Sequence, residues 1–371
     1  MAAGTGTLDR EEGLKRLVGT LEGLCALDGP AGFEQPVISR LEEEFRPLSD
    51  RVELDRFGNL YALRQGAGRA PRLMLAAHAD EVGLLVKSVE DAGFLRFEKL
   101  GGVADHSLPG TAVVVGGRHH GVVGLKSSHL MTPAERDRVP PYREMYLDVG
   151  APDANAVAEM GIRPGDPVCF HAPLRRLGPN RVAGKAIDDR TGCTLLLELF
   201  RHLQGLTPAG DLWAVITVQE EVGLRGAQVA AYRVNPDYAV AVDTIAAGDT
   251  PETAGRREQP VGIGKGPALV LASEGSRAGS IAHPKVWRYL QEAASRAGVA
   301  CQTALMIGYG TTDAAAIHLA REGVPTGGLS IPRRFAHSAQ ELLDLGDMWD
   351  GFRVLCALVE GMEGHRDLGF L

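Results

Sequence analysis

The sequence has few cysteines, no long apolar run and no concentration of positive charge. Its cysteines (Cys25, Cys169, Cys193, Cys301 and Cys356) are odd in number, lie far apart and form no Cys-x-x-Cys pair, so we expect free thiols in a reducing compartment. No stretch approaches the roughly 18 consecutive apolar residues that span a bilayer. The first 17 residues lack the apolar core of a signal peptide. These absences predict a cytoplasmic protein with no membrane partner.

Charge and composition exclude further classes of protein. The 371 residues include 39 Lys and Arg against 47 Asp and Glu, a net charge of −8, and there is no basic tract. Nucleic acid is therefore not an expected partner. The hydrophobic fraction of 44% and the charged fraction of 23% are typical of folded proteins and exclude wholesale disorder. The length predicts two domains, or one large domain with an insertion.

The pattern of apolar residues predicts an α/β fold. Helical spacing is found over 8–27 and about 35–46, short extended runs follow at 51–64, and the continuous apolar run 73–77 predicts a strand buried on both faces. After residue 181, predicted helices and strands alternate, which indicates an open sheet flanked by helices. The helices are expected at 190–204, 223–231, 284–297, 312–322 and 341–362, and the strands at 213–218, 238–242, 267–272 and 327–331.

Residues 82–180 have a different pattern. Short alternating runs are broken by Gly, Pro, Asp and His, and the only helical turns, at 133–138 and 153–161, are weak. Such a pattern is typical of a small β-rich domain with hairpins. We therefore predict a mixed open α/β sheet flanked by helices and formed by residues 1–81 and 181–371. An inserted β-rich domain, residues 82–180, splits it.

Histidine and carboxylate side chains follow several predicted strands. Ligands of open α/β sheets bind at the carboxyl ends of the strands, so these residues are candidates for a site. They are His78, Asp80 and Glu81 after the first buried run, Gln219, Glu220 and Glu221 after strand 213–218, Asp243 after strand 238–242, His337 after strand 327–331, and Asp188 and Asp189 before helix 190–204. This mixture of imidazole and carboxylate suits a divalent metal, above all zinc.

The charges of these residues fit two metal ions. Two-metal hydrolases hold their ions roughly 3.5–4 Å apart, which a shared carboxylate would achieve. Asp188, Asp243 and Glu221 supply three of the four negative charges that two divalent ions require, a bridging hydroxide would supply the fourth, and Glu220 remains as a base. Each residue could also have a purely structural role, such as a helix N-cap at Asp188 and Asp189. A purely structural explanation is less favoured, because separate structural roles would have to occur together at several strand ends of one sheet.

The same segments resemble the cobalt- or zinc-dependent glutamyl-aminopeptidase family, which includes the tetrahedral aminopeptidases. The matching segments are HADEVGLLV (78–86), DVGAPDANAVAEMGIRPGDPV (148–168), KAIDDRTGC (185–193), VQEEVGLRGA (218–227), AVDT (241–244) and GTTDAAAIHLAREGVPTGGLSIPRRFAHSAQE (310–341). The chain departs from the family pattern at Thr311, where a second glycine is expected, and at Ala272-Ser273, where an aspartate is expected. A preference for glutamyl residues is therefore not transferred.

The resemblance implies a role for each candidate ligand. His78 and Asp243 would bind one metal ion, Glu221 and His337 would bind the other, and Asp188 would bridge both. The expected ions are Zn or Co, with Mn as a further candidate.

The resemblance also implies the remaining parts of the site and the assembly. Glu220 would be the general base, Asp80 would orient His78, and the peptide bond between Asp188 and Asp189 would be cis. The insertion would be a dimerisation domain, and the dimers of this homo-oligomer would build a tetrahedral dodecamer whose active sites face an inner cavity. The substrates would be peptides with a free N-terminus.

The expected function is therefore that of a metal-dependent aminopeptidase that removes N-terminal residues by activating a bridging water. The alternative is a dinuclear-metal hydrolase of another small amide or acyl-amino acid, and a further one is a binding protein that keeps only the fold. A glycosidase pair formed by Glu220 and Glu221 is disfavoured, because neighbouring side chains on a strand start toward opposite faces. Arg333 and Arg334 could pair with an acidic first residue of the substrate, but we favour a structural role for both.

Overall fold

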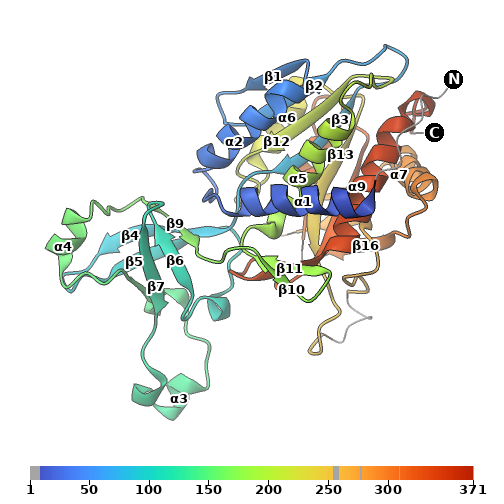
Figure 1. The fold of residues 1–371 in the computed structure, drawn as a ribbon. Helices are drawn as coiled ribbons and strands as arrows, with labels where there is room; N and C mark the ends of the chain where they lie inside the picture. Colours follow the sequence, from blue (N-terminus) through green and yellow to red (C-terminus); the bar gives the residue numbers. More distant parts are fainter. Residues whose placement is uncertain (1–8, 254–258, 276–277, 309, 371) are drawn as a thin grey trace.

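The computed structural model describes residues 9–253, 259–275, 278–308 and 310–370. It has two parts (Figure 1): helices flank a large sheet, and a small barrel projects from one side of it. The helices are α1 (Arg10–Cys25), α2 (Gln35–Phe45), α3 (Pro133–Arg136), α4 (Ala154–Glu159), α5 (Ile187–His202), α6 (Arg225–Val234), α7 (Pro284–Ala297), α8 (Ala314–Ile317) and α9 (Leu345–Glu360).

The strands follow the chain as β1 (Arg51–Leu54), β2 (Leu60–Arg64), β3 (Leu73–His78), β4 (Gly83–Val89), β5 (Leu95–Leu100), β6 (Ala112–Val115), β7 (His119–Gly124), β8 (Tyr146–Asp148), β9 (Pro167–Phe170), β10 (Arg175–Leu177), β11 (Arg181–Gly184), β12 (Leu212–Thr217), β13 (Tyr238–Ala246), β14 (Ala268–Glu274), β15 (Gly279–Ile281), β16 (Gln302–Ile307), β17 (Thr326–Arg334) and β18 (Glu341–Asp344). The large sheet has the order β1-β2-β12-β3-β13-β17-β18-β11-β10, and β14 joins it beside β17 and also pairs with β15 and β16.

The centre of the large sheet is parallel and covered on both faces. β12, β3, β13 and β17 are parallel to one another, so their carboxyl ends share one edge. Leu73, Leu75 and Ala77 of β3 pack toward α1, α2, α5 and α9, whereas Met74 and Ala76 pack toward α6 and α8. This alternation explains why the run 73–77 is apolar at every position.

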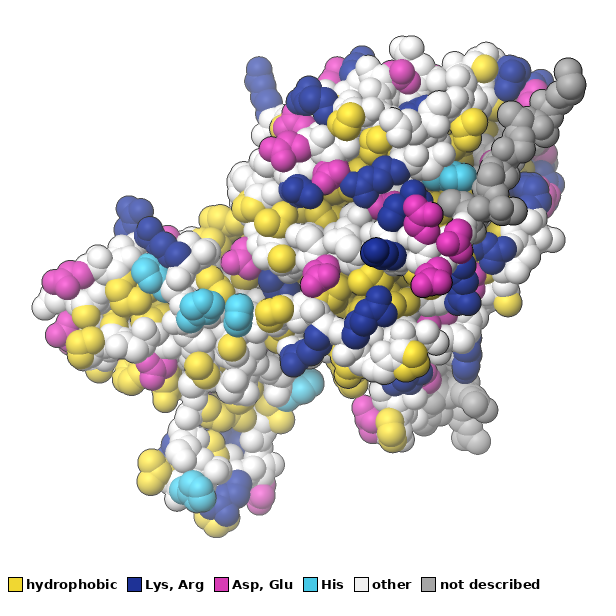
Figure 2. Space-filling model, in the orientation of Figure 1, with side chains coloured by type: hydrophobic (Ala, Val, Ile, Leu, Met, Phe, Trp, Pro, Cys, Tyr) yellow, Lys and Arg dark blue, Asp and Glu magenta, His cyan; other side chains and the backbone are white. Residues whose placement is uncertain are grey.

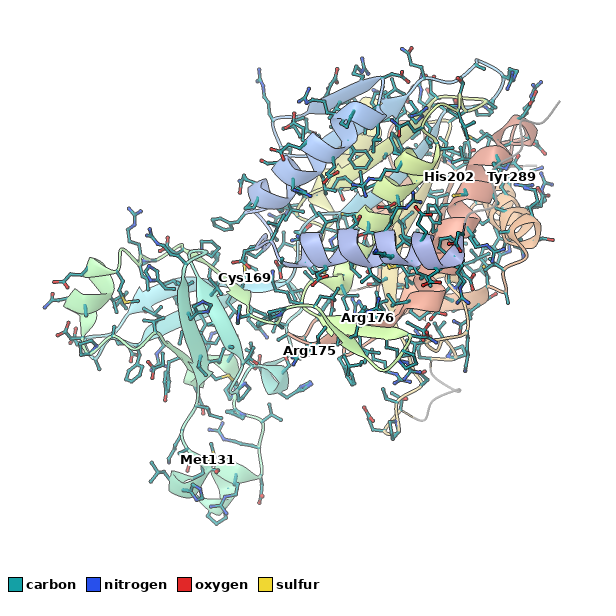
Figure 3. The ribbon with its side chains drawn as sticks, viewed as in Figure 1. Met131, Cys169, Arg175, Arg176, His202 and Tyr289 are labelled. Carbon is teal, nitrogen blue, oxygen red and sulfur yellow. The ribbon has the colours of Figure 1, made fainter. Side chains whose placement is uncertain are left out.

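The inserted segment forms a closed barrel with a core of its own. Its strand order is β4-β5-β8-β7-β6-β9, and its interior contains Leu84, Val113, Leu147 and Phe170. The chain between β7 and β8 leaves the barrel as an arm that carries α3, with Met131 near its end (Figure 3). β10, which lies inside the range predicted for the insertion, pairs with β11 and extends the large sheet.

The predicted α/β fold with a β-rich insertion is confirmed, but two local predictions were wrong. The helix expected at 341–362 begins with strand β18, which pairs with β11 and β17, and α9 starts only at Leu345 with Asp344 as its N-cap. The helix expected at 312–322 is reduced to α8. Strand β16 was not predicted; its apolar run, 304–307, is only four residues long, and the strand pairs only with β14 among the described strands.

The structure bears on two expectations from the sequence, one about membrane-spanning helices and one about free cysteines. None of its helices, within the described ranges, is long and apolar enough to cross a membrane. The five cysteines are free, and four of them are buried. On the face of the molecule shown in Figure 2, Lys and Arg side chains are interspersed with Asp and Glu side chains over the α/β part.

Candidate metal centre

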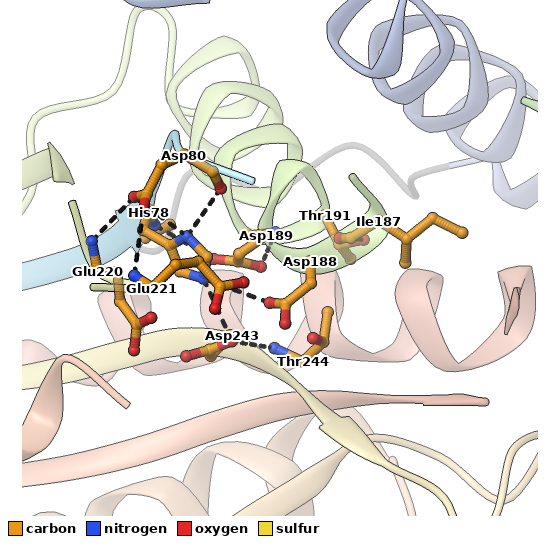
Figure 4. A network of polar contacts seen from close by, with 12 residues as sticks. His78, Asp80, Ile187, Asp188, Asp189, Thr191, Glu220, Glu221, Asp243 and Thr244 are labelled. Carbon is orange, nitrogen blue, oxygen red and sulfur yellow. Dashed lines mark hydrogen bonds and ion pairs between the residues drawn. The ribbon is translucent and has the colours of Figure 1, made fainter. Parts of the chain in front are cut away.

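The parallel strands bring most of the predicted site residues to one edge of the large sheet. β3 ends at His78, and Asp243 lies in the carboxyl-terminal half of β13. Glu220 and Glu221 follow β12 within a few residues, and His337 follows β17. Figure 4 shows the side chains of His78, Glu220, Glu221 and Asp243 converging beside one another.

Asp188 reaches the same place from the start of α5, which packs against β3 and β13. The backbone angles of Asp188 and Asp189 are not helical, and the peptide bond between them is cis, as the family resemblance implied. The regular helix therefore starts after these two residues, and both of their side chains remain buried at the edge of the sheet.

His78, Asp188 and Asp243 form one group whose nitrogen and oxygen atoms could share a metal ion. The Nε2 atom of His78 lies 3.3 Å from Oδ1 of Asp188 and 3.9 Å from Oδ1 of Asp243. One ligand atom from each of the three residues lies within 4.8 Å of the others. All three residues are buried.

Asp188, Glu221 and His337 form a second group of the same kind. The Nε2 atom of His337 lies 3.4 Å from Oδ2 of Asp188 and 3.4 Å from Oε2 of Glu221. The ligand atoms again lie within 4.8 Å of one another. Asp188 thus belongs to both groups, and it presents Oδ1 to His78 but Oδ2 to His337.

The protonation of these groups fits a site that requires added positive charge. Burial and the nearby Asp188 raise the pKa of Asp243 well above its usual range. Burial raises the pKa of Glu221 to about 7, although His337 opposes the shift. Oδ1 of Asp188 and Oε1 of Glu221 are buried and have no hydrogen-bond partner among the described residues. Buried carboxylates of this kind are normally paired or bound to a metal, so the residues fit divalent cations.

Asp80 links the first histidine to the loop after β12. Its carboxylate accepts hydrogen bonds from the backbone N–H of Glu220 (3.0 Å) and of Glu221 (3.1 Å). Nδ1 of His78 lies 3.5 Å from the Asp80 carboxylate and 3.1 Å from its backbone oxygen. Asp80 therefore orients the imidazole of His78 mainly through its backbone oxygen, and its carboxylate holds the backbone of two acidic residues.

The side chain of Glu220 lies beside the first group (Figure 4). Burial and the charges of Glu221 and Asp243 raise its pKa well above the usual range, although His78 opposes them. Its backbone is held by Asp80, and the preceding Gln219 donates its N–H to Oε1 of Glu34 at 3.1 Å. Glu220 is therefore a carboxyl group with a raised proton affinity that is not itself part of either group of candidate ligands.

Glu341 takes part in the site although the sequence analysis did not select it. Its Oε2 accepts a hydrogen bond from the N–H of Asp188, and its Oε1 accepts one from the N–H of His337, both at 2.9 Å. Glu341 therefore holds the backbone of Asp188, which belongs to both groups, and of His337, which belongs to the second group. The only sequence signal was its place at the end of the segment 310–341, because a single glutamate beside an apolar run is most often a solvated surface residue.

Arg333 and Arg334, adjacent in β17, have different partners. The guanidinium of Arg333 is buried, donates to Oδ2 of Asp188 and donates to Oγ1 of Thr244 at 2.6 Å. Arg334 makes two hydrogen bonds of 2.8 Å with Asp249. Both guanidinium groups are thus engaged within the chain, but Arg333 contacts a candidate ligand, whereas Arg334 pairs with Asp249.

Glu81 was a candidate after β3, but it lies in a different cluster. Its carboxylate receives a hydrogen bond of 2.7 Å from Nζ of Lys185, which also lies 3.2 Å from Asp28. Cys169, at the base of the barrel (Figure 3), is the third potential ligand there. Arg190 lies 3.5 Å from the same carboxylate of Glu81, so two buried cations balance the two carboxylates and the cluster does not need a metal ion.

The barrel supplies part of the wall of the site. Gly101 and Gly102 follow β5 and approach the second group closely. A Cβ atom at Gly102 would lie 2.7 Å from Nδ1 of His337, and a Cβ atom at Gly101 would lie 3.3 Å from Cβ of Glu221. Glycine is therefore required at Gly102 by the proximity of the imidazole.

Comparisons with known proteins agree on one family. A family model described as M42 glutamyl aminopeptidase matches residues 58–353. The glutamyl aminopeptidase of Lactococcus lactis subsp. cremoris is 32% identical, over 93% of this chain and 96% of its own length.

Solved structures give the same result. An aminopeptidase from the archaeon Desulfurococcus kamchatkensis is 37% identical, with a TM-score of 0.89, over 95% of this chain and 97% of its own. The TET1 peptidase of Pyrococcus horikoshii, which can assemble into a tetrahedron or a large octahedral shell, is 30% identical, with a TM-score of 0.79, over 92% of this chain and 99% of its own. The chain accordingly belongs to the M42 glutamyl aminopeptidase family and is an aminopeptidase by that membership.

Proposed function

We propose that this aminopeptidase works with two divalent metal ions. His78 and Asp243 hold one ion, Glu221 and His337 hold the other, and Asp188 is shared by both. The observation that carries the proposal is that Asp188 directs one carboxylate oxygen to each of two compact groups of candidate ligands. The nitrogen and oxygen donors suit Zn or Co, and Mn accepts the same set.

The proposed mechanism gives the proton transfers to Glu220. The two cations, when bound, supply Lewis acidity that polarises the scissile carbonyl and favours ionisation of water. Glu220 accepts the proton of the attacking water and then donates it to the leaving amine. Burial raises the pKa of Glu220, and a higher proton affinity favours its acceptance of the proton from water. Asp80 keeps Glu220 in place through the backbone hydrogen bond of 3.0 Å.

The proposed substrates are peptides with a free N-terminus, and the proposed assembly is a homo-oligomer. The family match and the aminopeptidases among the relatives support the substrate class. The assembly of the Pyrococcus horikoshii relative into a tetrahedron or a large octahedral shell supports a homo-oligomer. The further proposal is that residues 82–180 form dimers and that these dimers build a tetrahedral dodecamer. No preference for an acidic first residue is proposed, because Arg333 and Arg334 already have partners within the chain.

The function can be tested with a panel of aminoacyl-p-nitroanilides. Chelator-stripped protein should be inactive, and addition of Zn, Co or Mn should restore cleavage of substrates with a free amino group. N-acetylated versions of the same substrates should not be cleaved, because the proposed enzyme acts on N-terminal residues. Release of nitroaniline from the acetylated compounds alone, by metal-loaded protein, would instead establish an amide hydrolase that does not act on free N-termini, and release of acetate from N-acetyl-amino acids would establish a hydrolase of acyl-amino acids.

The close approach of Gly102 to His337 leads to a second prediction. In Gly102→Ala the added methyl group would lie 2.7 Å from Nδ1 of His337, so the imidazole must leave the position in which its Nε2 atom lies 3.4 Å from both Asp188 and Glu221. We expect the affinity for one of the two ions to fall by about tenfold, the lower end of the effect of disturbing the support of a ligand. Calorimetric titration of the stripped protein with Zn would measure it.

Gly364→Ala is the matched control, because a Cβ atom at Gly364 has no neighbour within 4 Å. This variant should bind both ions as the unmodified protein does. Equal affinities in Gly102→Ala and Gly364→Ala would show that His337 does not hold a metal ion at this position.

A further inference from the structure

Arg333 places a permanent positive charge inside the group of carboxylates. Its side chain is 5% exposed, and the guanidinium contacts Oδ2 of Asp188 and lies 3.4 Å from Oε1 of Glu341. Its third contact is the hydrogen bond to Oγ1 of Thr244. An arginine remains charged throughout the physiological range of pH, so this cation does not leave the site by losing a proton.

The two candidate groups are affected unequally by this cation. The guanidinium shares Oδ2 of Asp188 with His337, whereas Oδ1 of Asp188 faces His78. The second group must therefore share one of its oxygen ligands with an arginine, and the first group does not. A guanidinium bound to a carboxylate oxygen weakens that oxygen as a ligand, and its charge repels a second cation close by.

We propose that Arg333 is a positioning residue that makes the two metal sites unequal. It competes for Oδ2 of Asp188, so the ion held by Glu221 and His337 is bound more weakly and exchanges more readily than the ion held by His78 and Asp243. The inference rests on the two-metal centre proposed above. It adds that the inequality originates in the charge of one residue that is not a ligand.

The test compares the binding of Co²⁺ by chelator-stripped proteins, followed by calorimetry and by the visible absorption of bound Co²⁺. The unmodified protein should bind two ions with different affinities, and His337→Ala should lose only the weaker one. In Arg333→Met, which removes the charge but keeps an unbranched side chain, the weaker affinity should rise by at least about tenfold, because nearby charges in a poorly solvated site interact strongly. The tighter affinity should change much less.

Three further variants separate charge from shape. Arg333→Gln also removes the charge and should reproduce Arg333→Met, so the test does not depend on the folding of one variant. Arg333→Lys retains the charge and should keep the weaker site weak. Arg334→Met is the matched control, because the adjacent Arg334 pairs with Asp249 away from the candidate ligands. Its Co²⁺ binding should equal that of the unmodified protein.

The outcomes distinguish this inference from the proposed function. If the unmodified protein binds fewer than two Co²⁺ ions, the two-metal centre itself is wrong. If it binds two ions with equal affinity, the inference is wrong. If it binds two ions unequally but the neutral variants leave the weaker affinity unchanged or lower it, Arg333 is a structural support, and the inference is again overturned while the metal centre stands.

Discussion

Replacing Glu220 by glutamine is expected to lower kcat by about 10²-fold or more, within the usual range for the loss of a general base. The amide has almost the same shape as the carboxylate but cannot accept the proton of the attacking water. Metal content should remain at two ions per chain, because Glu220 is in neither group of candidate ligands. The measurements are kcat with the best aminoacyl-p-nitroanilide and metal content by mass spectrometry.

Glu221→Gln is the informative companion to this variant. Glu221 is adjacent in the chain and its N–H is held by the same carboxylate, Asp80, but its own carboxylate lies 3.4 Å from His337. It should lose activity together with metal, whereas Glu220→Gln should lose activity alone. A Glu220→Gln protein with full activity and both ions would remove Glu220 from the role of base.

Replacing Asp188 by alanine is expected to release both metal ions. Asp188 is common to the two groups, so its removal takes one oxygen ligand from each of them. The loss of affinity should exceed the roughly 10–100-fold typical of residues that only support a ligand. After dialysis against metal-free buffer the variant should contain far less than one ion per chain, and its peptidase activity should disappear.

Asp243→Ala is the variant to compare with Asp188→Ala in the number of ions that it loses. Asp243 belongs only to the group of His78, so its loss should release one ion and leave the other. Retention of two ions by Asp188→Ala would contradict the assignment of Asp188 as the shared ligand. Loss of both ions from each variant would instead show that the two sites fill only together.

The edge of the sheet at which the candidate residues meet was predictable from the sequence, because local patterns fix it. Buried runs identified the central strands, and the carboxyl ends of parallel strands always share an edge, so His78, Glu220 and Asp243 were expected to lie together. Asp188 could be selected as a candidate only because the sequence pattern changes at the boundary between the insertion and the next helix. The structure brings His78, Asp188 and Asp243 together and places Glu221 and His337 at the same Asp188.

Arg333 and Glu341 were not predictable as parts of the site, because their positions depend on pairing between distant strands. β17 pairs with β13 on one side and with β18 on the other, and this register places Arg333 opposite Ala246 and Leu343. Glu341 begins β18, a segment whose apolar spacing also fits a helix. Local periodicity cannot distinguish these possibilities, since the strand exists only through its neighbours.

The proximity of Gly101 and Gly102 to Glu221 and His337 couples the barrel to the candidate metal centre. The candidate ligands come from the large sheet and the residues that follow its strands, yet the barrel forms part of the wall around two of them. The barrel therefore cannot be exchanged, deleted or rotated as an independent module without altering the geometry of the site. A substitution in the loop after β5 can therefore change the candidate metal centre although the loop belongs to the barrel.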